Sequence, residues 1–153
     1  MDSAPILFLV PDYSRHGGLE IYNEGVVRAF LELGHQVDLL VINQNKAEPR
    51  PGLNIQAIKP SRPIGRFLYH HNWPRYLDHL LHRRPPRANE IVVCGHACML
   101  PQALRYARRH HLPCWCLAFG LEVRGELIPD MRQALSEVDR LITISRFTEH
   151  HLR

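Results

Sequence analysis

The segment 6–42 constrains the fold more strongly than any other part of the chain. It begins and ends with short, uninterrupted apolar runs, at residues 6–10 and 37–42, which are typical of parallel strands buried on both faces. Between them, residues 19–33 carry apolar side chains at helical spacing. Such a crossover is nearly always right-handed, so we expect the helix to begin at the carboxyl edge of the sheet. The segment therefore predicts a strand, a helix and a second, parallel strand.

The periodicity of residues 19–33 also predicts which face of this helix is buried. Side chains three and four positions apart lie on the same side of a helix. Gly34 follows directly and can adopt the left-handed conformation that ends many helices. The predicted buried face consists of Leu19, Tyr22, Val26, Ala29 or Phe30, and Leu33.

The rest of the chain continues the alternation of strands and helices. Residues 64–84 are expected to form two short helices broken at Pro74, since proline suits the start of a helix and not its interior. This alternation predicts an α/β fold with a Rossmann-like, doubly wound and mainly parallel sheet. The other predicted strands are 53–58, 91–94, 113–119 and 138–144, and the other predicted helices are 100–109 and 129–137.

The composition fits one folded domain and excludes several classes of protein. A chain of 153 residues that is 45% hydrophobic can bury a core. No apolar run reaches the roughly 18 residues of a membrane-spanning helix, and the N-terminus lacks the basic region of a signal peptide. We therefore expect a cytoplasmic protein with reduced cysteines. The net charge of +4 fits an anionic ligand or a membrane surface but is too small to indicate nucleic acid.

Two features at the carboxyl edge suggest a binding site. Gly17 and Gly18 precede the first helix, where free amides and the helix dipole attract phosphate and the missing Cβ atoms allow close approach. The alternative is that these glycines only let the chain turn. His96 follows the predicted strand 91–94 directly into the expected cleft, where it could contact a ligand or substrate.

Further candidates follow the last two predicted strands. Glu122 lies in a loop with Gly120 and Arg124, and an arginine with a carboxylate could position a hydroxyl-rich or phosphorylated ligand. A surface ion pair is the alternative. Ser145 is placed to cap a final helix and, with Arg146, joins the same edge of the sheet.

The sequence lacks the motifs of several other enzyme classes. The glycine-x-serine-x-glycine elbow is missing, and no Walker lysine follows the glycine pair. The dinucleotide fingerprint needs an acid at the far end of the second strand, where this chain has Asn43, whereas Asp38 lies at the wrong end. Cysteines in predicted buried strands act as small apolar residues, so no zinc site is expected. The cysteines in predicted strands are Cys94, Cys114 and Cys116, and the spacings Cys94/Cys98 and Cys114/Cys116 are marginal for zinc.

Three segments, in the same order, resemble the N-terminal domain of retaining GT-B glycosyltransferases of family 4. Residues 17–20 (Gly-Gly-Leu-Glu), followed by a helix that runs into 31–37 (Leu-Glu-Leu-Gly-His-Gln-Val), resemble the opening of that domain. Residues 119–122 (Phe-Gly-Leu-Glu) are similar to its His-Gly-x-Glu/Asp segment, and 137–145 resemble its close. Phe119 stands where the family usually has histidine, a role that His96 could take over.

The resemblance implies a transfer reaction and a role for each candidate residue. The enzyme would be a hexosyltransferase-type glycosyltransferase of polysaccharide or glycolipid biosynthesis. It would move sugar, with retention, from a nucleotide-sugar donor to a glycan or lipid-linked acceptor. No metal or cofactor would be needed, because helix termini and basic side chains bind the phosphates. Gly17 and Gly18 would bind the donor phosphates, His96 and Glu122 would be catalytic, and the acceptor or cleft residues would be His16, Glu20, Gly120, Arg124, Ser145 and Arg146.

The resemblance further implies that residues 1–153 form the acceptor-side half of the enzyme. The family's C-terminal donor domain carries most of the nucleotide site and a Glu-x7-Glu motif, so this half is expected to be inactive alone. Residues 64–84, with interleaved aromatic and basic side chains, could contact the inner face of a membrane or simply pack on the sheet. Two other classes stay open: a non-catalytic, flavodoxin-like ligand-binding or interaction module, and another Rossmann-type enzyme such as a nucleotide-sugar epimerase.

Overall fold

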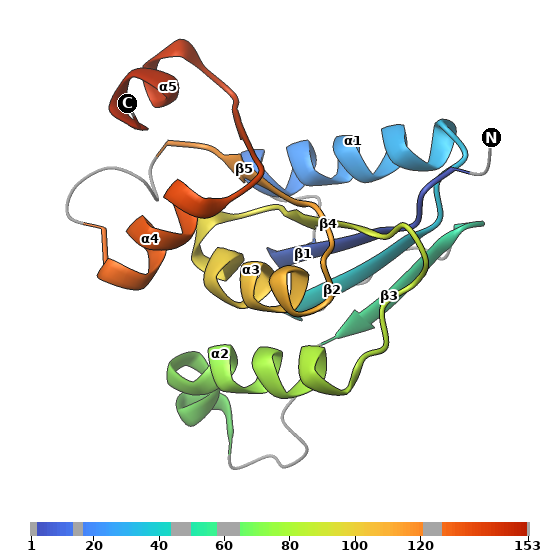
Figure 1. Ribbon diagram of the computed structural model, residues 1–153, viewed down its shortest axis with the longest axis horizontal. Helices are drawn as coiled ribbons and strands as arrows, with labels where there is room; N and C mark the ends of the chain where they lie inside the picture. The colour runs from blue at the N-terminus through green and yellow to red at the C-terminus, as the bar shows by residue number, and fades with distance from the viewer. Residues whose placement is uncertain (1–2, 14–16, 44–49, 58–64, 121–126, 153) are drawn as a thin grey trace.

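The computed structural model describes residues 3–13, 17–43, 50–57, 65–120 and 127–152. Within these residues, six strands form one sheet in the order β3-β2-β1-β4-β5-β6, with all neighbouring strands parallel (Figure 1). This topology confirms the predicted doubly wound α/β fold. The elements are β1 Ile6–Asp12, α1 Gly18–Glu32, β2 Val37–Asn43, β3 Leu53–Ala57, α2 Gly65–Arg83, β4 Ile91–Cys94, the 3-10 helix η1 Ala97–Met99, α3 Leu100–Arg109, β5 Cys114–Ala118, α4 Pro129–Glu137, β6 Arg140–Thr143 and α5 Arg146–Leu152.

The strand order reverses at β1, which is hydrogen-bonded to β2 on one side and to β4 on the other. Leu9, for example, is paired with Leu40 of β2 and with Cys94 of β4. The chain leaves β1 toward one half of the sheet and enters the other half through β4. The loops after β1 and β4 therefore diverge at the carboxyl edge, which is the place where doubly wound sheets bind ligands.

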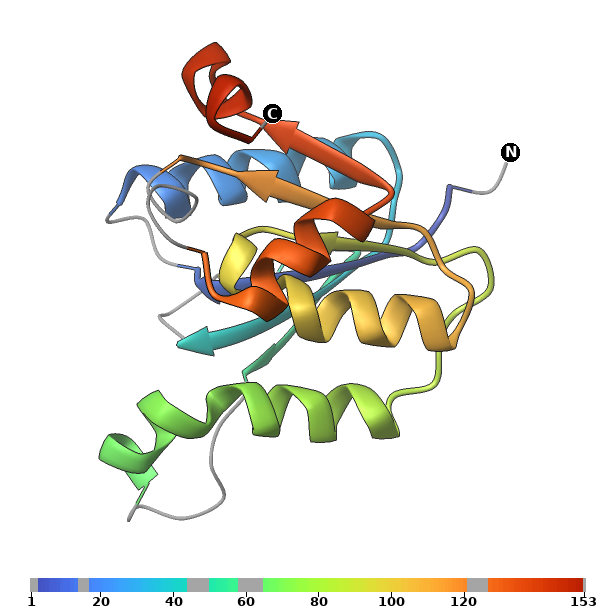
Figure 2. The same cartoon turned by 60° about the vertical axis from the view of Figure 1, so that its left-hand side comes forward.

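Helices cover both faces of the sheet. Figure 2 shows α3 and α4 in front of the strands and α1 behind them. On the side of α2, α3 and α4, the core includes Leu7 and Leu9 of β1. On the side of α1, Val27 belongs to a second core with Phe8 and Val10. Strand β1 is thus buried on both faces, as its uninterrupted apolar run predicts.

Helix α1 confirms the predicted helix but only part of its predicted buried face. Gly34 follows the helix with φ of 84°, as expected for a residue that ends it. The fully buried positions are Asn23 and Val27, whereas Tyr22 is 40% exposed and Leu33 is 70% exposed. Apolar periodicity could not find Asn23, because a buried amide depends on a hydrogen-bond partner that another element supplies.

Helix α2 corrects the prediction of two short helices, since Gly65–Arg83 is one helix with Pro74 inside it. Proline removes one backbone hydrogen bond from a helix interior. The helix continues because the segment after the proline is fixed to the core, where Leu77 and Leu81 are almost completely buried. In the described part of the chain, no helix is long and apolar enough to cross a membrane.

A cluster of charged side chains closes the amino edge of the sheet. Arg84 donates hydrogen bonds to both carboxylate oxygens of Glu90, at 2.6 and 2.8 Å, and to Asp38 at 2.7 Å. It also donates to the Tyr106 hydroxyl at 2.6 Å. Burial opposes the charge of Arg84, but its hydrogen bonds to Glu90 and Asp38 raise its pKa above the ordinary value. Asp38 is therefore a structural ion-pair partner far from the carboxyl edge.

Replacing Arg84 should strongly destabilise the protein, because the side chain of Glu90 is completely buried and would lose its counter-charge. We expect Arg84→Ala to lower the free energy of unfolding by about 3–5 kcal/mol in urea titrations. The matched control is Arg105→Ala, which breaks an ion pair with Asp78 whose side chains are 51% and 42% exposed. That change should cost less than about 1 kcal/mol. Equal losses in the two variants would contradict this account of the cluster.

Tyr106 should make stability depend on alkaline pH. Burial, and then the negative charge of Glu90, raise the pKa of Tyr106 from 10.0 to about 12. The folded protein therefore holds the phenolic proton more tightly than the unfolded chain. Its contribution is complete below about pH 10 and is lost as the pH rises through about 12. In urea titrations across this range, the free energy of unfolding should depend less on pH for Tyr106→Phe than for the unmodified protein. An equal dependence on pH in the two proteins would contradict this role of Tyr106.

Candidate functional site

Loops from four strands meet at the carboxyl edge on the β4 side of the reversal point. Those after β1, β4, β5 and β6, together with the first turns of the helices α1 and α5 that follow, contain all ten residues predicted from the sequence or the resemblance. Three of them, His16, Glu122 and Arg124, lie outside the described residues. The other seven belong to three groups: the start of α1, the start of η1, and the contact between β5 and α5.

The start of α1 combines an open glycine with a nearby carboxylate. Gly17 is the N-cap residue, and among the residues that the structure describes no side chain caps the helix there. An ideal Cβ at Gly17 would lie 2.0 Å from Oε2 of Glu20, so the carboxylate occupies the space of a side chain at that position. At Gly18, by contrast, an ideal Cβ would meet no atom of the described residues within 4 Å. Any residue other than glycine at 17 would have to displace Glu20.

The electrostatics of this helix start favour an anion. Unpaired amides and the helix dipole place partial positive charge at the N-terminus of a helix of fifteen residues. Glu20, in the first turn, is the negative group that now faces it. A phosphate could be held at the exposed backbone of Gly18 if the carboxylate turned away, because both anions are attracted to the same amides.

His96 begins η1 at the end of β4, and its ring orientation is fixed by the backbone. Its Nδ1 accepts a hydrogen bond from the amide of Cys98 at 3.2 Å. In the neutral ring the proton is therefore on Nε2, which is the tautomer set by that hydrogen bond. The carbonyl of His96 accepts from the thiol of Cys94 at 3.0 Å. The hydrogen bond from Cys98 thus holds the ring of His96 at the end of β4.

Two residues that sequence reasoning missed surround the connection between β4 and His96. Gly95 lies so close to β1 that an ideal Cβ would be 2.7 Å from atoms of both Phe8 and Val10. Asn23 of α1 is fully buried, and its Nδ2 donates to the carbonyl of Gly95 at 3.2 Å. The only sequence signal was a glycine between a strand and a histidine, and nothing connected it with a helix 72 residues earlier.

Gly120 and Ser145 are brought together through Thr148 of α5. Gly120 has φ of 114°, and an ideal Cβ there would be 2.8 Å from Oγ1 of Thr148. The Ser145 hydroxyl accepts a hydrogen bond from the Thr148 amide at 3.1 Å, which confirms the predicted helix cap. Arg146 begins α5 with an exposed side chain. These contacts fix α5 against the end of β5 and leave a cation beside the edge.

The cysteines are placed as apolar residues in the sheet. Cys94, Cys114 and Cys116 are buried, and burial raises the pKa of the Cys94 and Cys114 thiols well above the ordinary value. Such thiols are poor nucleophiles and poor metal ligands because they stay protonated. Among the residues that the structure describes, no group of three or more histidine, cysteine or acidic side chains could hold a metal ion.

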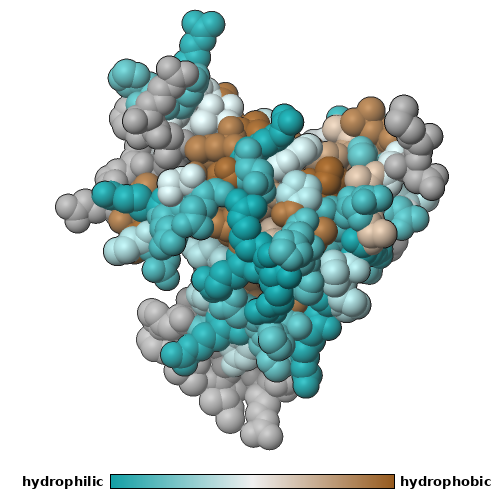
Figure 3. All heavy atoms as spheres, in the orientation of Figure 1, coloured by the Kyte–Doolittle hydropathy of each residue, from teal (hydrophilic) through white to brown (hydrophobic). Residues whose placement is uncertain are grey.

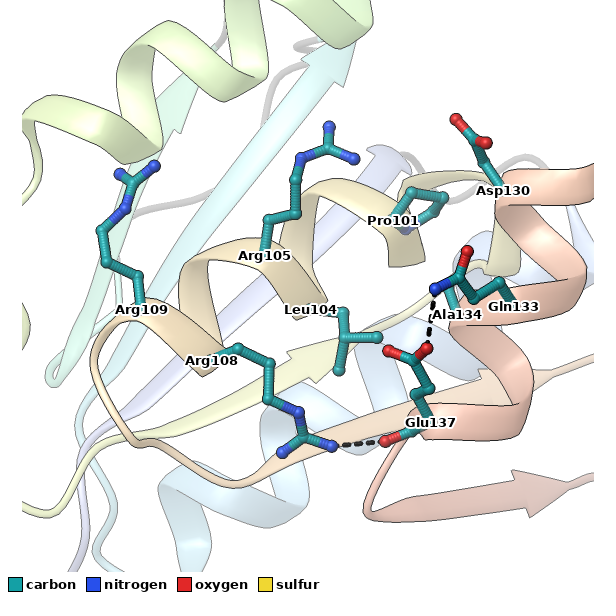
Figure 4. Close-up of a pocket in the computed structure, with 9 residues that line it drawn as sticks. All are labelled: Pro101, Leu104, Arg105, Arg108, Arg109, Asp130, Gln133, Ala134 and Glu137. Atoms are coloured by element: carbon teal, nitrogen blue, oxygen red, sulfur yellow. Dashed lines mark hydrogen bonds between the residues drawn. The ribbon is translucent and has the colours of Figure 1, made fainter.

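A groove of about 580 Å³ lies elsewhere, between α3 and α4 (Figure 4). Its arginines are already engaged: Arg108 pairs with Asp139 at 3.0 Å, and Arg105 pairs with Asp78 at 2.8 Å. None of the predicted site residues lines it, so it is separate from the carboxyl-edge site. The lining residues are Pro101, Leu104, Arg105, Arg108, Arg109, Asp130, Gln133, Ala134 and Glu137.

Comparison with solved structures shows the same fold in glycosyltransferases that contain UDP. UGT89C1 of Arabidopsis thaliana complexed with UDP has a TM-score of 0.63 and 14% identity, over 97% of this chain and 47% of that one. LpCGTa in complex with UDP has a TM-score of 0.61 and 11% identity, over 97% and 49%. The chain therefore spans about half the length of these structures. At this identity the likeness shows the fold alone, one half of a GT-B fold.

A different protein shares the fold less closely. Phenylacrylic acid decarboxylase from Aquifex aeolicus has a TM-score of 0.54 and 11% identity, over 94% of this chain and 82% of that one. A sequence comparison with curated proteins gives no match. The comparison with protein families is more specific, because residues 17–153 match the glycosyl transferase 4-like domain. This match begins at the glycine pair and covers most of the chain, and the protein accordingly belongs to the glycosyl transferase 4-like domain family.

Proposed function

We propose that this chain is the acceptor-side domain of a retaining, hexosyltransferase-type glycosyltransferase that uses a nucleoside diphosphate sugar. The observation that carries the proposal is the open backbone of Gly18 at the start of α1, next to the reversal point of the sheet. Solved structures with the same fold contain UDP or UDP-L-rhamnose, which supports a nucleotide-sugar donor. The acceptor is a glycan or a lipid-linked molecule.

In this proposal, the first turn of α1 binds the donor diphosphate without a metal. The amides of Gly17 and Gly18 donate to phosphate oxygens, and the helix dipole stabilises the negative charge. Glu20 occupies this place when no donor is bound and turns toward a sugar or acceptor hydroxyl when the phosphate arrives. The same amides would stabilise the charge that develops on the diphosphate as the sugar leaves.

His96 is proposed to act on the sugar side of the cleft. Its ring is held at the end of β4 by the hydrogen bond from the Cys98 amide to Nδ1, and there it would contact the transferred sugar or the acceptor. Glu122 and Arg124 follow β5 in the sequence and are proposed to complete the constellation. The exposed cation of Arg146 would attract the same anionic donor.

A lipid-linked acceptor is supported by the character of α2. In the view of Figure 3, hydrophilic side chains cover most of the layer formed by α2, α3 and α4. On α2, Arg75, Tyr76 and His79 are exposed, so an aromatic side chain lies beside an arginine and a histidine. We propose that this surface makes a peripheral contact with the inner face of an anionic membrane in the cytoplasm, where it would collect the acceptor.

Binding of UDP should distinguish two glycines of the same helix. An ideal Cβ meets nothing within 4 Å at either Gly18 or Gly25. Both alanine variants should therefore fold, each with added helix propensity. Only Gly18→Ala puts a methyl group between the amides and a phosphate. In NMR titrations, the affinity of the Gly18→Ala variant for UDP should be about tenfold or more below that of the unmodified chain. This is the effect expected from losing one hydrogen bond to a charged group.

The titration of the unmodified chain should shift the amide signals of Gly17 and Gly18 first, and Gly25→Ala should bind UDP like the unmodified chain. Equal affinities in the two variants, or shifts confined to the groove between α3 and α4, would contradict the phosphate site. The chain by itself is expected to bind the nucleotide weakly and not to transfer sugar. Measurable turnover of a nucleotide-sugar by the purified chain of 153 residues would show that this domain alone is sufficient for sugar transfer.

A further inference from the structure

The feature that the proposed function leaves unexplained is a polar side chain inside the α1 face of the core. Asn23 is completely buried. Its neighbour on the same helix face, Val27, is equally buried but apolar, as expected for a core position. Burying an amide costs free energy unless hydrogen bonds compensate. An apolar residue of similar size would fill the same space without that cost. The amide therefore points to a role other than packing.

The hydrogen bonds of Asn23 show what it holds. Nδ2 donates to the carbonyl of Gly95 at 3.2 Å, and the amide of Gly95 donates to the carbonyl of Leu9 at 2.7 Å. Gly95 is thus fixed from the helix side and from the strand side at once. Phe8 and Val10 leave no room even for a methyl group at this position. The connection after β4 cannot shift toward β1, and Asn23 keeps it from moving away from α1.

The second polar atom of Asn23 strengthens this interpretation. Its Oδ1 is buried and has no hydrogen-bond partner among the described residues. It lies 2.9 Å from an ideal Cβ at Gly95, facing the same connection. An amide that leaves one atom unsatisfied is a poor choice for stability alone. The hydrogen bond from Nδ2 to the carbonyl of Gly95 is the contact that compensates for the burial of the amide.

This contact joins the two parts of the proposed site. Asn23 belongs to the helix whose first turn carries Gly17 and Gly18, and Gly95 immediately precedes His96. We propose that Asn23 is a positioning residue, which holds His96 in a fixed place relative to the phosphate-binding turn. The role in transfer rests on the proposed function, whereas the effect of Asn23 on His96 can be measured without it.

The test measures the tautomer of His96 by the ¹⁵N chemical shifts of its ring nitrogens in the 153-residue chain. In the unmodified protein, the neutral ring should carry its proton on Nε2, because Nδ1 accepts from Cys98. In Asn23→Leu, which keeps the number and branching of the side-chain heavy atoms but removes the donor, the loop should relax. The two ring ¹⁵N signals should then move toward each other, as expected for a mixture of tautomers.

Val27→Ala is the matched control, since it removes buried volume from the same helix face without touching Gly95. It should lower stability and leave the His96 signals unchanged. If Asn23→Leu does not fold, Asn23→Ala takes its place, with the same expectation. A folded Asn23 variant with the original His96 tautomer would overturn the proposal, and so would an equal change in Val27→Ala. Failure of the unmodified chain to bind UDP would count against the proposed function only.

Discussion

The parallel pairing of β1 with β2 on one side and β4 on the other is the constraint on which the rest of the structure depends. Both partners use the same short stretch, so that Leu9 is bonded in register to Leu40 and to Cys94. Helices pack on both faces of β1, and because the strand order reverses there, the loops after β1 and β4 lead to opposite halves of the sheet. The two loops start from neighbouring strands, so the first turn of α1 lies near the end of β4.

The two edges of the sheet differ in whether their polar and charged groups are paired. At the amino edge, Arg84 and Arg87 pair with Glu90 and Asp38, so that two cations balance two carboxylates. At the carboxyl edge, polar groups remain open: within the described part of the chain, an ideal Cβ at Gly18 would meet nothing within 4 Å, and no side chain caps the N-terminus of α1. Stability is thus concentrated away from the place where binding requires unsatisfied donors, a separation typical of α/β proteins.

Much of the fold could be predicted because apolar periodicity reports local structure. Helices α3 and α4 have the predicted bounds, and Ser145 caps α5 as expected. Two predictions failed where a distant contact outweighed a local rule. Pro74 does not break α2, since burial of the segment after it holds the helix together. Tyr22 is 40% exposed, and Asn23, whose Nδ2 donates to the carbonyl of Gly95 at the end of β4, is completely buried instead.

The sequence by itself determined the order of strands and helices along the chain and the glycine pair at the start of α1. It also determined the family that these motifs resemble. These properties depend on neighbours along the chain, so a linear pattern can report them. Only the tertiary structure decided that Glu20 covers Gly17, and that Asn23 meets Gly95 from 72 residues away. Such contacts depend on how strands pair and on how much room their side chains leave. No local spacing in the chain records that geometry.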